Sequence, residues 1–111
     1  METIKELAQK GVPQIVNTMY EVHKTHYYEE NNTASIILNN GYIVSIIHPM
    51  DSEDPNLWSV AVSDYDGYFD WDILKPFFRT RSDKESGCVN CHSEEDVCKL
   101  VYAIEAFAPI I

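Results

Sequence analysis

Two β-rich runs decide the fold of this chain: ASIILNN (residues 34–40) and YIVSIIHP (residues 42–49). Asn40-Gly41 joins them, and this dipeptide between β-formers is the strongest short signal for a tight hairpin. The run NLWSVAVSDY (residues 56–65) follows and alternates apolar with small or polar residues, which is typical of a strand with one buried and one wet face. Together the three runs predict an antiparallel meander.

The next segment, YFDWDIL (residues 68–74), continues the alternation. It follows Asp66-Gly67, a second turn signal, and its large apolar residues alternate with Tyr68, Asp70 and Asp72. We therefore expect a fourth strand here. On such a strand Asp70 and Asp72 would share one face, about 7 Å apart.

Helices are expected at both ends of the chain. Ile4, Leu7 and Ala8 form a short amphipathic turn, and apolar spacing over residues 13–26 predicts a second helix that begins at Pro13. The segment SEEDVCKLVYAIEAFAPII (residues 93–111) begins with Ser and Asp at capping-box spacing and carries a single apolar stripe. The polar residues 79–92 are expected to form a loop.

At 111 residues the chain is long enough for one hydrophobic core but not for two. We therefore predict one α+β domain over residues 1–111. Its centre is an antiparallel meander of three to four strands, and its N-terminal and C-terminal helices pack on one face of that sheet.

Negative charge is concentrated in the middle of the sequence. The net charge is −10, and no lysine or arginine lies between Lys24 and Lys75, where nine acidic residues occur. Nucleic acids and anionic membranes need positive charge, so we expect neither to bind directly. A basic protein is the favoured partner, although acidic loops also serve solubility alone.

The location of the protein follows from two absences in the sequence. No apolar run is long enough to span a bilayer, and the N-terminal residues lack the basic and apolar regions of a secretory signal. We expect a cytoplasmic protein whose thiols stay reduced.

The run CVNCH (residues 88–92) raises the question of a cofactor. A Cys-x-x-Cys-His run is typical of c-type haem attachment, but haem is attached to exported chains and needs an apolar sheath, whereas this neighbourhood is acidic. Cys88, Cys91, His92 and Cys98 supply four donors of the kind that zinc prefers. A structural zinc site or a redox module is therefore one alternative. Our main expectation is a loop without a cofactor.

Other chemistries have little support in the sequence. DYDGYFDWD (residues 64–72) resembles a calcium loop in composition, but its glycine falls at position 4, whereas the EF-hand places glycine at position 6. No nucleophile elbow, phosphate-binding loop or zinc-protease motif is present. We expect that this protein is not an enzyme.

The acidic residues and tyrosines around the predicted sheet are the candidate partner-binding surface. Carboxylates steer a basic partner, and aromatic faces accept guanidinium groups. The candidate residues are Asp51, Glu53, Asp54, Asp64, Tyr65, Asp66, Tyr68, Asp70 and Asp72.

A resemblance favours the same interpretation. The stretch NNGYIVSIIHPMDSEDPNLWSVAVSDYDGYFDW, within residues 33–74, resembles small acidic proteins carried by phages and other mobile elements. These include anti-CRISPR and anti-restriction inhibitors, some of which look like DNA mimics. The resemblance implies a non-catalytic inhibitor that binds a basic nucleic-acid-binding defence protein or nuclease complex in the host cytoplasm.

Two other protein-binding functions share these features. A toxin-immunity protein would also use acidic residues against a basic partner. A small adaptor would bind through an apolar patch, and its acids would only keep it soluble.

Overall fold

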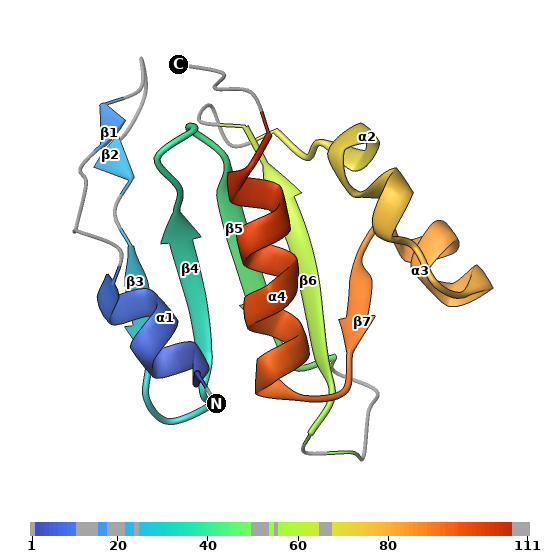
Figure 1. Ribbon diagram of the computed structural model, residues 1–111, viewed down its shortest axis with the longest axis horizontal. Coiled ribbons are helices and arrows are strands. Elements are labelled where there is room, and N and C mark those ends of the chain that lie inside the picture. Colours follow the sequence, from blue (N-terminus) through green and yellow to red (C-terminus); the bar gives the residue numbers. More distant parts are fainter. Residues whose placement is uncertain are drawn as a thin grey trace.

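A five-stranded antiparallel sheet forms the centre of the described part of the chain (Figure 1). The computed structural model describes residues 2–10, 16–17, 22–23, 25–49, 54, 56–64 and 68–107. The strands lie side by side in chain order: β3 (His26–Tyr28), β4 (Thr33–Ile37), β5 (Ile43–Ile47), β6 (Trp58–Ser63) and β7 (Val89–Cys91).

Helices and a separate strand pair complete the described structure. The helices are α1 (Ile4–Lys10), α2 (Trp71–Leu74), the 3-10 helix η1 (Lys75–Phe77), α3 (Arg81–Ser86) and α4 (Glu94–Glu105), and β1 (Val16–Asn17) pairs with β2 (Val22–His23). Helices α1 and α4 lie on the same face of the sheet, as predicted, and α2 and α3 lie beyond the β7 edge (Figure 1). None of the described helices is long and apolar enough to cross a membrane.

The predicted hairpin between β4 and β5 is confirmed. Ile37 pairs with Ile43, and residues 38–42 connect the strands, with residues 39–41 at the tip. The Leu38 N–H donates to the Tyr42 carbonyl over 2.9 Å, which closes the loop, and Gly41 has φ of 97°. A glycine with positive φ at the end of a three-residue loop is the usual geometry of such hairpins.

The alternation predicted for β6 is also confirmed. Trp58, Val60 and Val62 are buried on the helix-covered face, whereas Ser59 and Ser63 on the other face are half-buried. The core cluster contains the matching residues of the neighbouring strands together with the stripe of α4. The buried members of that stripe are Val97, Leu100, Val101 and Ile104. Each fully buried aliphatic side chain contributes about 1.5–3 kcal/mol, so the packing of α4 on the sheet is the main source of stability.

The predicted helix over residues 13–26 is wrong in its described part. Val16–Asn17 and Val22–His23 form the short pair of strands, and His26 begins β3. The spacing fitted a helix, but five of these fourteen residues are β-branched, and β-branched residues favour extended backbone. Strand β3 gains hydrogen bonds by extending the sheet beside β4, with Tyr27 opposite Ala34.

The predicted fourth strand over residues 68–74 is also wrong. Its strand character is limited to Phe69, which forms an isolated bridge with Ser63. Asp70 then caps α2: its side chain accepts a hydrogen bond from the Ile73 N–H over 3.3 Å. Aspartate is one of the best N-cap residues, so the chain begins a helical turn where the alternation suggested a strand.

The expected loop over residues 79–92 contains α3 and β7. Thr80 caps α3 by accepting a hydrogen bond from the Asp83 N–H over 3.1 Å, and Gly87 ends the helix in the left-handed region with φ of 73°. These two residues are ordinary helix boundary signals. The loop was expected because the segment is polar, and the two boundary signals were not recognised.

A buried carboxylate joins α3 to the sheet. Asp83 is fully buried, and it accepts hydrogen bonds from the Arg79 N–H over 2.9 Å and from the Asn90 N–H over 3.3 Å. The Arg79 guanidinium donates to the Asn90 carbonyl over 3.4 Å. The N–H and the carbonyl of Asn90 in edge strand β7 are thus both hydrogen-bonded to side chains. This arrangement protects the edge from pairing with another chain.

We predict that Asp83→Asn lowers the free energy of unfolding by about 2–3 kcal/mol, because its amide NH₂ would face an N–H donor in a buried site. Urea unfolding followed by circular dichroism measures this change. Glu85→Gln, on the exposed side of the same helix, is the control and should change the value by less than about 0.5 kcal/mol. Equal effects of the two substitutions would contradict the role given to Asp83.

The Arg79–Asp96 ion pair predicts a dependence of stability on pH. The Arg79 Nη2–H donates to Asp96 Oδ1 over 2.8 Å, and this hydrogen bond holds the pKa of Asp96 below its ordinary value. The stabilisation is therefore complete above the ordinary aspartate pKa of about 4 and is lost as the pH falls through the lowered value.

We accordingly expect Asp96→Asn to unfold at a lower urea concentration than the wild type at pH 7. The difference between the two midpoints should shrink as the pH falls below the ordinary aspartate pKa and the wild-type carboxylate becomes protonated. A difference that stays constant over this range would contradict the contribution of the ion pair.

Candidate functional site

The connection from β6 to α2 folds back on itself at one end of the sheet. The Asp64 N–H donates to the Tyr68 carbonyl over 2.9 Å, and the Tyr68 N–H donates to Asp64 Oδ1 over 3.0 Å. The Asp70 N–H then donates to the Val62 carbonyl over 3.0 Å. These contacts fix residues 68–70 beside the end of β6, and the turn predicted at Asp66-Gly67 lies outside the described residues.

Three large aromatic residues are exposed in this connection and at the start of α2. The exposed fraction is 71% for Tyr68, 71% for Phe69 and 52% for Trp71. We use the name acidic-aromatic segment for Asp64, Tyr68, Phe69, Asp70, Trp71 and Asp72. Grouped exposed aromatics are typical of surfaces that bind other proteins, because removing their apolar surface from water is favourable.

The carboxylates of the acidic-aromatic segment have local partners. Asp70 caps α2, and the Asp72 carboxylate lies 2.8 Å from Lys75 Nζ in an exposed ion pair. Burial raises the pKa of Tyr42, and the negative charges of Asp70 and Asp64 raise it further. Ile43 pairs with Ser63, so Tyr42 and Asp64 lie at the same end of the sheet.

The remaining acidic candidates do not extend this surface in the described structure. Asp54 lies in the connection between β5 and β6, at the opposite end of the sheet from Asp64. His48 holds the base of that connection: its Nδ1 lies 2.8 Å from the Leu57 carbonyl oxygen and its Nε2 lies 2.8 Å from that of Asn31. The other candidates, Asp51, Glu53, Tyr65 and Asp66, lie outside the described residues.

Two of the residues predicted as zinc ligands face opposite sides of the sheet. Cys91 is fully buried under the helices, whereas Cys88 lines a shallow groove on the other face with Ser59 and Asn90. A zinc knuckle needs a tight turn to bring its two thiolates together, and here the run CVNCH contains strand β7 instead. His92 is exposed after that strand.

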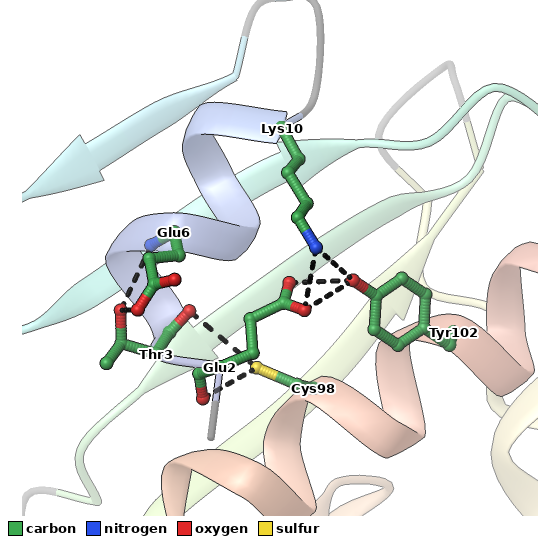
Figure 2. A network of polar contacts seen from close by, with 6 residues as sticks. All are labelled: Glu2, Thr3, Glu6, Lys10, Cys98 and Tyr102. Atoms are coloured by element: carbon green, nitrogen blue, oxygen red, sulfur yellow. Dashed lines mark hydrogen bonds and ion pairs between the residues drawn. The ribbon is translucent and has the colours of Figure 1, made fainter.

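Cys98 lies in a third environment, on α4 beside the start of α1 (Figure 2). Its thiol donates to the Glu2 carbonyl over 3.6 Å and to the Thr3 carbonyl over 3.7 Å. Next to it, the Tyr102 hydroxyl and the Lys10 ammonium both bind the Glu2 carboxylate, over 2.7 Å and 3.0 Å. The described contacts of Cys98 and its neighbours therefore hold α4 against α1 and the residues before it.

The described residues include no group of three or more histidine, cysteine or acidic side chains arranged to hold a metal ion. Burial raises the pKa of Cys91 to about 12, and the Asp96 charge adds to this effect. Burial likewise raises the pKa of Cys98 to about 11. Both thiols are protonated at neutral pH, and the thiolate is the form that binds metals and attacks electrophiles. Zinc binding by Cys88, Cys91, His92 and Cys98 stays a prediction.

Comparisons with protein-family models, with curated proteins and with solved structures found no match to this chain.

Sequence reasoning missed part of this site. Phe69 and Trp71 were expected to alternate with acidic residues along a strand, and the structure places both at the surface outside any strand ladder. The signal that could have found them is Asp70, since an aspartate before a short apolar run can cap a helical turn.

We predict that iodoacetamide alkylates Cys88 before Cys91 and Cys98 in the native protein at pH 8, because Cys88 alone among the three is not buried. Mass spectrometry of tryptic peptides measures the order. The same labelling after incubation with zinc tests the metal hypothesis, since a site on all four residues would protect Cys88 and yield zinc on metal analysis. Faster labelling of Cys91 or Cys98 without zinc would contradict the burial described above.

Proposed function

We propose that this protein is a non-catalytic inhibitor that binds a basic, nucleic-acid-binding protein through its acidic-aromatic segment. The observation that carries the proposal is the run of exposed aromatics Tyr68, Phe69 and Trp71, interleaved with the carboxylates of Asp70 and Asp72. The partner is blocked because the segment covers residues that would otherwise contact nucleic acid.

Charge and aromatic surface have separate tasks in this proposal. The carboxylates raise the rate of encounter with a basic surface over distances of about 8 Å, the Debye length at physiological salt. The aromatic side chains then supply the buried area that slows dissociation, and aromatic residues dominate binding energy at protein interfaces. An acidic surface that only served solubility would have no need of three exposed aromatics.

The position of the carboxylates favours a local binding surface over mimicry of a long DNA backbone. Asp54 lies at one end of the sheet, and Asp64, Asp70 and Asp72 lie at the other. A patch at one end fits an arginine-containing cleft or a helix of the partner. The resemblance to phage inhibitors favours a defence nuclease as that partner, and a basic toxin would bind by the same chemistry.

The test replaces three carboxylates without removing their local hydrogen bonds. Asn retains the acceptor oxygen that caps a helix, so Asp64→Asn, Asp70→Asn and Asp72→Asn together remove charge and keep the fold. The control is Glu29→Gln, Glu85→Gln and Glu95→Gln, which removes the same charge from exposed sites outside the segment.

We expect the wild type to capture a basic nucleic-acid-binding protein from a bacterial lysate at about 0.05 M salt and to release it at about 0.5 M. Duplex DNA should displace the captured protein. The triple Asp variant should bind it at least about tenfold more weakly, a loss of about 1.4 kcal/mol, and the Glu variant should bind as the wild type does. Equal affinity of the two variants, or capture that salt does not affect, would rule out the proposal.

A further inference from the structure

Trp71 packs against the end of α3. A Cβ atom built on Gly87 would lie 2.8 Å from Cε2 of the Trp71 indole, 2.9 Å from Nε1 and 3.2 Å from Cδ1. Real Cβ atoms do not approach other atoms this closely, so only glycine leaves room for the ring in this position. The pyrrole side of the indole therefore lies directly against the backbone of Gly87.

Several hydrogen bonds hold Gly87 and the end of α3 in place beside the indole. The Gly87 N–H donates to the Asp83 carbonyl over 2.9 Å at the end of α3, and the Asp83 carboxylate joins that helix to Arg79 and β7. Gly87 thus combines two roles, a left-handed backbone with φ of 73° and close approach to Trp71. The indole is ordered by this contact before any partner arrives.

The rest of the Trp71 side chain faces solvent. Its exposed fraction is 52%, and its indole N–H has no hydrogen-bond partner among the described residues. An aromatic ring that is already ordered yet half open loses little conformational entropy on binding. Such pre-ordered tryptophans are typical anchors of protein interfaces.

We propose that Trp71, held in place by Gly87, is the anchor of the acidic-aromatic segment, and that it binds an arginine guanidinium of the partner on its open face. This inference rests on the proposed function. A guanidinium is planar and weakly hydrated, so it stacks on an indole, and its N–H groups can donate to a carboxylate at its edge, which Asp70 or Asp72 supplies. A lysine ammonium is more strongly hydrated and gains less from the same surface.

The first experiment needs no partner. Trp58 and Trp71 are the two tryptophans of the chain, so Trp58→Phe leaves Trp71 as the single indole fluorophore. In this background Gly87→Ala should shift the emission of Trp71 to longer wavelength and increase its quenching by acrylamide, because the added methyl group displaces the ring. Gly41→Ala is the matched control, since Gly41 also has positive φ, and it should leave both signals unchanged.

The second experiment compares peptides of eight arginines and of eight lysines at equal net charge and low salt. We expect the wild type to bind the arginine peptide about fivefold or more tightly than the lysine peptide. Gly87→Ala and Trp71→Leu should both lose this preference, and Trp71→Leu serves if the glycine variant does not fold. Tyr28→Ala removes a similarly exposed aromatic outside the segment and should retain the preference.

The two proposals fail in different ways. If the wild type binds the two peptides equally, or if Gly87→Ala behaves as Gly41→Ala in fluorescence, the anchor role of Trp71 is overturned while binding to a basic protein can stand. If neither peptide binds and no basic protein is captured from the lysate, the proposed function fails together with the arginine assignment.

Discussion

The structure depends on the burial of one face of the sheet under α1 and α4. Alternating residues on β4, β5 and β6 supply aliphatic side chains to that face, and the stripe of α4 covers them. The other face carries Ser35, Ser45 and Ser59 together with the buried Ile37, Ile43 and Ala61. Ser82 and Ser86 of α3 border a groove on this face beside Ser59.

Strand β7 has only three residues, and side chains from other elements hold it at the edge of the sheet. Val89 and Cys91 point into the core, and the backbone of Asn90 is bound by Asp83 and Arg79. Arg79 also pairs with Asp96 at the start of α4. A few charged side chains therefore fix α3, β7 and α4 relative to one another. The same framework supports Gly87, and through it the position of Trp71.

The sequence predicted the parts of the fold in which pattern and residue type agree. The hairpin at Asn40-Gly41, the alternation of β6 and the stripe of α4 each had both, and the structure confirms them. The helix expected over residues 13–26 had helical spacing but β-forming residues, and the residue types prevailed. The run from Phe69 to Ile73 had strand spacing, but Asp70 could cap a helical turn, and the local hydrogen bond prevailed.

The candidate site was predictable in composition but not in shape. The excess of acids and the tyrosines are visible in the sequence, and Asp64, Tyr68, Asp70 and Asp72 do lie in one connection. The separation of Asp54 from them follows from the direction of β6, which a list of acidic residues does not contain. The contact of Trp71 with Gly87 joins residues from two elements, one expected as a strand and the other as a loop, so no local pattern could indicate it.

The contacts of Glu2 with Lys10 and Tyr102 connect the beginning of the chain to its last described helix (Figure 2). Ile4 and Asn32 likewise both donate to Glu94 on that helix, over 3.0 Å and 2.9 Å. Helix α1 also contacts β3 and β4, so during synthesis it can pack on the sheet first, whereas its contacts with α4 form only after residues 94–105 have been made. Contacts between residues so distant in sequence are slow to form, and we expect the junction of α1 with α4 to be completed late in folding.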